Sequence, residues 1–259
     1  AAVGRMSGMD FGTALRTLAS RQKTAKGAPA YSRFVNRKLG RVLAAACYVA
    51  GLTPNQVTAI SAALSASAIV LVALVEPAAW QAVAVTAALV LGYAFDSADG
   101  QLARLRGGGS SAGEWLDHMV DCVKIATLHA AVLIAAYRFF DLPTAVYLLI
   151  PLGFMAVNSV LFFGMILTDQ LRRLHLSITG PIPPGPERPS TLRSLLVIPT
   201  DYGLLCLTFL LLAATEVFFA VYTALFLGHL LFLLAALVKW FREVAALQPA
   251  STASTVQSH

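Results

Sequence analysis

Charged residues are scarce in this chain of 259 residues, since Asp, Glu, Lys and Arg together make up only 12% of it. Soluble domains carry about 25% charged residues. A hydrophobic content of 58% and a mean hydropathy of +0.72 lie far from such a composition. The composition therefore excludes an ordinary soluble domain and indicates a protein that crosses a membrane several times.

Cysteine is also rare, with three residues in all. Cys47, Cys122 and Cys206 are scattered through apolar stretches without a Cys-x-x-Cys pair, which excludes a disulfide framework and a thiolate zinc site. The first 40 residues lack a short apolar core followed by small residues, so we expect no signal peptide. The net charge is +6, but its distribution over the ends and loops of an apolar chain argues against nucleic acid as a partner.

Long apolar runs are the dominant pattern of the sequence. A helix needs about 20 apolar residues to cross the roughly 30 Å hydrocarbon core of a bilayer. Six runs approach or exceed this length, and the fifth is the shortest. We therefore predict an all-α polytopic membrane protein with six transmembrane helices, at about residues 57–75, 79–104, 114–139, 143–168, 201–215 and 217–241.

An amphipathic segment precedes the first run. Between residues 31 and 52 basic side chains alternate with apolar ones, which is typical of a helix in the plane of the membrane surface; a solvated linker is the alternative. Thr53 followed by Pro54 predicts a helix start, and the proline-rich stretch 169–200 predicts an irregular linker. We expect a basic N-terminal segment, an amphipathic juxtamembrane helix, a six-helix domain and a disordered tail, at residues 1–29, 30–52, 53–245 and 246–259.

Lys and Arg are distributed unevenly along the chain. Nine of the 19 precede Thr53, and most others fall in the second and fourth loops or after the last run. The first and fifth loops have none. Because basic loops remain in the cytoplasm, we predict that both termini and the even-numbered loops are cytoplasmic.

Four carboxylates interrupt the second and third apolar runs. Asp96 and Asp99 are three residues apart and Asp117 and Asp121 are four apart, so each pair shares one helix face. A charge at bilayer depth costs at least about 2.5–3.5 kcal/mol, which calls for a partner. The short connection makes the two helices antiparallel neighbours, so the pairs are expected to converge and to bind divalent cations, Mg²⁺ or Mn²⁺, that carry a diphosphate.

A lysine and two histidines also lie within the apolar runs. Lys124, three residues after Asp121, either extends to the membrane surface or pairs with the acids. His129 and His229 lie in the middle of their runs, and we predict that they are hydrogen-bonded core residues rather than ligands.

Small residues surround the acids. Gly100, Ala103 and Gly113 continue the helix faces of the two pairs, and residues 107–109 are all glycine. Small side chains let a phosphorylated ligand approach the backbone, and they equally suit tight helix packing. Arg104 supplies a cation for phosphate oxygens; a positive charge that only sets the topology is the alternative.

Acids, glycines and Arg104 together form the pattern D-x2-D-G-x2-A-R-x8-G-x3-D-x3-D, from Asp96 to Asp121. The pattern resembles the signature of the CDP-alcohol phosphotransferase (CDP-alcohol phosphatidyltransferase) family, and the resemblance covers about residues 30–140. It implies six transmembrane helices and commonly a homodimer. It also implies transfer of a phospho-substituted group from a CDP-linked donor to an alcohol, with release of CMP.

The resemblance also implies roles for individual residues. Asp96, Asp99, Asp117 and Asp121 would hold two divalent cations. Asp121 would in addition accept the proton of the acceptor hydroxyl. The CDP moiety would contact Asn55, Gln56, Val57, Thr58, Gly100, Ala103, Arg104, Ser110 and Gly113.

Two cues in the motif point to different donors. The run from Gly113 to His118, Gly-Glu-x-x-Asp-His, resembles the choline/ethanolamine phosphotransferase branch, whereas residues 103–110 resemble the loop of bacterial phosphatidylinositol-phosphate synthases. In the first branch the Glu and His are implicated in activating the acceptor, which makes His118 a candidate general base. A hydrogen bond from His118 to a metal-bound aspartate is the alternative.

The leading hypothesis is a membrane enzyme of phospholipid biosynthesis that uses CDP-diacylglycerol. The basic fourth loop favours this donor, because Arg172, Arg173, His175, Arg188 and Arg193 could bind an anionic soluble acceptor. Charges that only keep this loop in the cytoplasm are the alternative. One alternative is a CDP-amino-alcohol donor with a lipid alcohol as acceptor. Others are an intramembrane prenyltransferase and a divalent-cation transporter.

Overall fold

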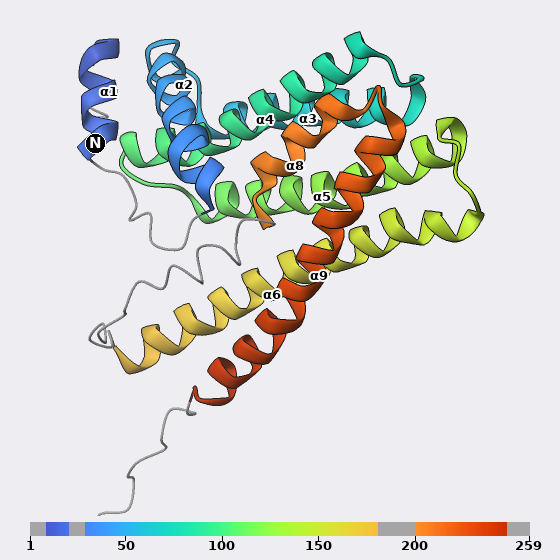
Figure 1. Cartoon of the computed structure of the whole chain (residues 1–259). Coiled ribbons are helices and arrows are strands. Elements are labelled where there is room, and N and C mark those ends of the chain that lie inside the picture. Colours follow the sequence, from blue (N-terminus) through green and yellow to red (C-terminus); the bar gives the residue numbers. More distant parts are fainter. Residues whose placement is uncertain (1–8, 21–28, 181–199, 248–259) are drawn as a thin grey trace, which may run out of the picture.

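The computed structural model describes residues 9–20, 29–180 and 200–247, and this part of the chain is helical with connecting loops (Figure 1). The first elements are α1, a π-helical turn η1, and α2, at Phe11–Ser20, Ser32–Asn36 and Arg37–Val49. The helices α3, α4 and α5 follow at Pro54–Leu74, Ala79–Leu105 and Ser111–Phe139. The remaining elements are η2, α6, α8, η4 and α9, at Ala145–Leu148, Leu149–Thr179, Tyr202–Thr208, Phe209–Leu211 and Thr215–Ala245.

Within the described part of the chain, five helices are long and apolar enough to cross a membrane. The shortest of them, α3, has 21 residues and is therefore about 31 Å long, the thickness of a hydrocarbon core. The others are α4, α5, α6 together with η2, and α9. The chain is thus an all-α integral membrane protein with several crossings.

The predicted fifth span, residues 201–215, takes a different form. Its described helix covers Tyr202–Leu211, which at about 1.5 Å per residue is half the thickness of the hydrocarbon core. The chain then turns before α9 begins at Thr215. A single helix over 201–215 is therefore wrong at its C-terminal end, and residues 181–199 lie outside the described part.

The predicted linker 169–200 begins later than expected, because α6 continues to Thr179. The helix α6 has 31 residues and is therefore about 46 Å long, which exceeds the thickness of the hydrocarbon core. Polar side chains stabilise the extension: Asp169 pairs with Arg172 and Arg173, each at 3.7 Å, along the helix. Hydropathy alone places the end of a span at the first charged residues. A helix can nevertheless extend past them when ion pairs between its side chains stabilise the additional turns.

The predicted amphipathic segment is helical, as η1 and α2. Gly40, Ala44 and Ala45 are buried, whereas Leu39 and Val42 are exposed. A Cβ at Gly40 would lie 2.6 Å from the Ser97 Oγ atom, so this glycine permits close packing on α4. The predicted basic segment 1–29 also contains a helix that was not predicted, α1, which lies beside α2 (Figure 1).

The start of α3 confirms the Thr53–Pro54 signature. Thr53 caps the helix: its side chain accepts a hydrogen bond from the Gln56 backbone N–H at 3.3 Å. The Gln56 side chain in turn accepts the Thr53 N–H at 2.8 Å, which completes a capping box. These residues fix where α3 begins and how it enters the bundle.

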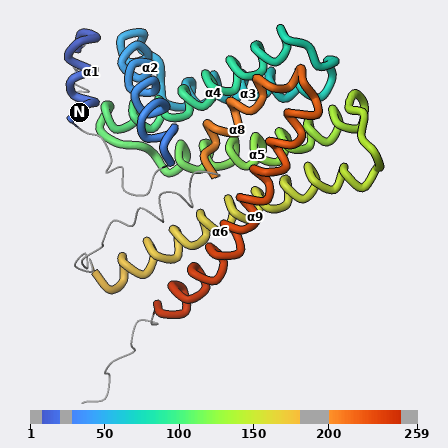
Figure 2. The backbone as a smooth tube through the Cα atoms, viewed as in Figure 1, coloured from blue at the N-terminus to red at the C-terminus, as the bar shows by residue number. Residues whose placement is uncertain are grey.

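Two buried apolar clusters pack against successive parts of α4. Leu89 on α4 belongs to a large cluster in which Phe154, Phe209 and Phe218 pack. Ala98, further along α4, belongs to a second cluster shared with α1, α2 and α3. In Figure 2, α4 ends beside α1 and α2 before the chain turns into α5. Packing in both clusters holds α4 in place.

His129 is a hydrogen-bonded core residue, as predicted. The Asn158 amide donates to its Nε2 atom at 2.6 Å, which leaves Nδ1 as the protonated nitrogen that donates to the Tyr222 hydroxyl, also at 2.6 Å. These residues come from α5, α6 and α9. His229 is also buried, and its Nδ1 atom lies 2.9 Å from the Leu225 carbonyl oxygen. The bonds around His129 thus tie three helices together.

We expect Tyr222→Phe to lower the free energy of unfolding by about 0.5–2 kcal/mol, because it leaves the buried His129 N–H without its acceptor. Tyr137→Phe is the matched control, since the Tyr137 side chain is 77% exposed. Thermal unfolding of the two variants in detergent measures the difference. Equal stabilities would show that the hydroxyl contributes nothing to the fold.

Candidate active site

The connection between α4 and α5 positions the acidic motif. Residues 106–110 join the two helices, and Gly107 and Gly108 adopt φ values of +102° and +130°, which favour glycine. Ser110 caps α5, and its hydroxyl accepts the Gly113 N–H at 3.0 Å. The turn sends α5 back antiparallel to α4, as predicted from the short spacing between the two acid pairs, and α3 packs against both helices (Figure 1).

Three of the four acids converge between these helices. Asp96 on α4 and Asp117 and Asp121 on α5 each offer a carboxylate oxygen, and these atoms lie within 4.8 Å of one another. All three side chains are partly buried. A cluster of hard anionic oxygens from two rigid helices suits Mg²⁺ or Mn²⁺. The residues present therefore fit the predicted divalent cations.

The fourth acid, Asp99, lies outside this group of three. It is buried, and its Oδ2 atom accepts a hydrogen bond from the Thr58 hydroxyl at 2.6 Å. Thr58 is one of the predicted CDP contacts, and in the structure its hydroxyl is hydrogen-bonded to Asp99. The link joins α3 to α4 directly beside the cluster.

Lys124 closes the acidic cluster. Its Nζ atom lies 2.5 Å from the Asp121 Oδ1 atom and 3.2 Å from the Asp96 Oδ1 atom. The side chain is only 6% exposed. Lys124 therefore pairs with the acids, as one of the two predictions had it, and does not extend to the membrane surface. The ammonium already occupies a cation position between two of the converging carboxylates, which supports the fit of this donor set to a metal.

Several predicted CDP contacts lie around this cluster. A Cβ at Gly113 would be 3.2 Å from the Asn55 Oδ1 atom, so the starts of α3 and α5 meet at these residues. Gly100 is open to Arg104, whose Nη1 atom would lie 3.6 Å from a Cβ there. Ala103 lies one residue before Arg104 and is partly buried. The structure thus places a guanidinium and backbone of small residues beside the acids.

Two predicted contacts have other partners in the structure. The Gln56 side chain belongs to the capping box of α3, and Val57 is fully buried in the apolar cluster shared with α1, α2 and α4. Their proposed contact with CDP stays a prediction.

His118 lies on a different side of α5 from the three acids. It is 3.9 Å from a Glu114 oxygen and meets the Phe162 ring of α6 edge-on, with centroids 6.4 Å apart. Glu114 in turn accepts a hydrogen bond from Arg173 at 2.6 Å. The Glu and His of the motif therefore face α6.

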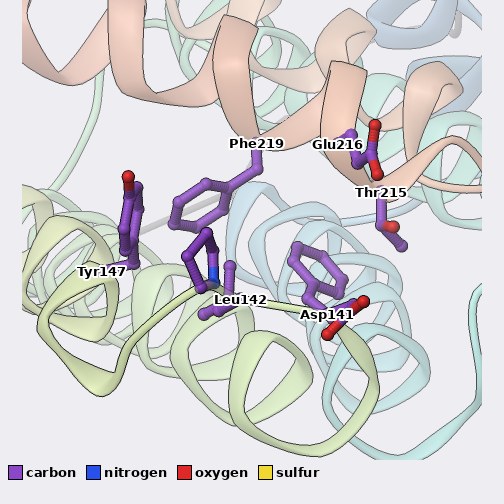
Figure 3. Close-up of a pocket in the computed structure, with 8 residues that line it drawn as sticks. Asp141, Leu142, Tyr147, Thr215, Glu216 and Phe219 are labelled. Atoms are coloured by element: carbon purple, nitrogen blue, oxygen red, sulfur yellow. The ribbon is translucent and has the colours of Figure 1, made fainter.

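A pocket of about 210 Å³ lies far from these residues (Figure 3). Asp121 and Phe139 are 18 residues apart on α5, so about 27 Å of helix separates the pocket from the acids. The pocket is therefore not part of the candidate site. Its lining comes from the loop after α5, from η2 and from the start of α9, with Phe140, Asp141, Leu142, Pro143, Tyr147, Thr215, Glu216 and Phe219.

Comparison with known families agrees with the motif and extends beyond it. A family model described as CDP-alcohol phosphatidyltransferase matches residues 51–241, which includes α3 to α6 and almost all of α9. A search of curated proteins finds no match. With three acids of the motif assembled on α4 and α5 and most of the chain matched, this protein belongs to the CDP-alcohol phosphatidyltransferase family of membrane enzymes, which transfer substituted phosphate groups.

Proposed function

We propose that this protein transfers the phosphatidyl group of CDP-diacylglycerol to an alcohol in phospholipid biosynthesis. The observation that carries the proposal is the convergence of Asp96, Asp117 and Asp121 within the family's motif. Together with Asp99, these residues would hold two divalent cations, Mg²⁺ or Mn²⁺. Bound cations would neutralise the diphosphate and stabilise the negative charge that develops on the leaving group.

The chain's own residues have distinct tasks in this proposal. Asp121 takes the proton of the acceptor hydroxyl, whose oxygen then bonds to the phosphorus that carries diacylglycerol. The bond from this phosphorus to the oxygen of CMP breaks, and CMP leaves. Arg104 donates to phosphate oxygens, while Asn55, Gln56, Val57, Thr58, Gly100, Ala103, Ser110 and Gly113 surround the nucleotide.

The proposed topology has six transmembrane helices, both termini in the cytoplasm, and a homodimeric assembly. In this topology Tyr202–Leu211 is part of the fifth crossing. The distribution of Lys and Arg supports the orientation. The start of α5 and the extension of α6 lie at the same end of the bundle, because Glu114 and Arg173 are in contact there. That end is the proposed cytoplasmic face, and soluble substrates reach the site from it.

A second candidate is a CDP-amino-alcohol donor with a lipid alcohol as acceptor. One observation favours it: the arginines of α6 are paired with acids. Arg172 contacts Glu243 of α9, and Arg173 contacts Glu114 at 2.6 Å. Arginines neutralised in this way attract a phosphorylated acceptor less strongly, and Arg188 and Arg193 lie outside the described residues. The apolar Phe162 beside His118 suits a lipid alcohol.

Release of CMP by the purified protein distinguishes these candidates. CDP-diacylglycerol and CDP-choline are each supplied with Mn²⁺ and a panel of labelled alcohols, and the lipid products are separated. We expect CMP and a labelled phospholipid from CDP-diacylglycerol. Product from CDP-choline and diacylglycerol alone would establish the second candidate, and no CMP from any CDP-linked donor would refute both.

His118 is the alternative general base, and the two assignments make different predictions. With Asp121 as the base, His118→Ala should lower turnover less than tenfold, whereas a loss of about 10²–10⁴-fold would make His118 the proton acceptor. Tyr137→Ala, at an exposed side chain near the other end of α5, is the control and should retain most activity. A loss below tenfold for His118→Ala would restrict His118 to a supporting role and leave Asp121 as the base.

A further inference from the structure

Lys124 is a buried cation that the proposed reaction does not use. It lies one helical turn after Asp121 and reaches across to Asp96, so a single ammonium contacts acids on both α4 and α5. Burial without partners would be costly for Lys124 and for either carboxylate. The ammonium is therefore stabilised by both carboxylates, and it offsets their mutual repulsion.

A third helix also contacts this ammonium. The Nζ atom lies 5.5 Å from the centre of the Tyr202 ring on α8, within the range of a cation–π interaction. The Tyr202 ring packs edge-on against Tyr93 of α4, with centroids 5.0 Å apart. Lys124 thus has a second favourable position beside an aromatic face, next to its position between the carboxylates.

We propose that Lys124 is an internal counter-cation that occupies part of the metal site and is displaced from the carboxylates when divalent cations bind. This inference rests on the metal-dependent function proposed above. Asp96 and Asp121 belong to the three acids whose oxygens converge, so the ammonium and a metal ion require the same atoms. Two cations that share ligands compete, and a fixed positive charge repels an incoming one.

Lys124 is in this proposal a positioning residue with two effects. Without metal, it holds α4 and α5 together against the repulsion of their acids. When metal binds, it lowers the affinity, because the ammonium must first leave two carboxylates. Removal of the charge should therefore destabilise the metal-free protein and strengthen metal binding. A lysine with a purely structural role would not produce the second effect.

Lys124→Met tests both effects, because methionine keeps an unbranched side chain of similar length without the charge. In EDTA we expect the melting temperature to fall by about 5 °C or more. The dissociation constant for Mn²⁺, measured by electron paramagnetic resonance without substrate, should fall about tenfold or more. Lys239→Met, at a half-exposed lysine that pairs with Glu243 at 3.4 Å, is the matched control and should leave Mn²⁺ affinity unchanged.

The outcomes separate this inference from the proposed function. If the wild-type protein binds no Mn²⁺, the metal-dependent function itself fails. If it binds Mn²⁺ and Lys124→Met binds no more tightly, only the role of Lys124 is overturned. Should Lys124→Met not fold, a structure of the wild-type protein with Mn²⁺ decides: we expect Nζ to have left at least one carboxylate, and retention of both contacts would overturn the proposal.

Discussion

Asp121→Asn is expected to lower turnover by at least about 10³-fold while the protein remains folded. Asn is isosteric with Asp but is neither an anionic metal ligand nor a proton acceptor, so both proposed roles of Asp121 are lost together. The fold should tolerate the change, because Lys124 keeps its contact with Asp96 at 3.2 Å. CMP release and size-exclusion chromatography of the same preparation measure the two properties.

Asp141→Asn is the matched control for this experiment. Asp141 is exposed and lies beyond the C-terminal end of α5, whereas the cluster lies near the start of this helix. The Asp141→Asn variant should retain the activity of the unmodified protein. Turnover of Asp121→Asn within a few-fold of that level would refute the assignment of Asp121 as ligand and base.

Removal of divalent cations should have an effect of similar size. With an excess of EDTA, CMP release should fall below about 1% of its initial rate, because phosphoryl-type transfer depends on charge neutralisation and positioning at the diphosphate. The carboxylates that converge within 4.8 Å would otherwise repel the anionic donor. Addition of Mg²⁺ or Mn²⁺ beyond the chelator should restore the rate.

Ionic strength is the variable that needs a control here. NaCl added to match the ionic strength of the restored sample should not recover activity, since monovalent ions only screen charge. An unchanged rate in EDTA would exclude the metal-dependent reaction and redirect attention to Lys124 and Arg104 as the cations that bind the donor.

Features encoded by local spacing were predicted well. The Thr53–Pro54 start of α3 follows from capping chemistry within four residues. The shared helix faces of the acid pairs follow from helical periodicity, and the short connection predicted that α5 runs back antiparallel to α4; that α3 packs against both helices was not predicted. The end of α6 was predicted too early, because hydropathy does not register ion pairs such as Asp169 with Arg173.

The amino-acid order was sufficient to identify the family, the acidic motif and the membrane-spanning character, since each depends on residue types at fixed separations. Contacts between distant segments settled the rest: Thr58 with Asp99, Lys124 with Asp96, and the position of His118 facing α6. Such contacts depend on how each helix is rotated about its axis and on which neighbours it packs against. Those quantities are set by side-chain packing across the whole bundle, which periodicity within one helix does not encode.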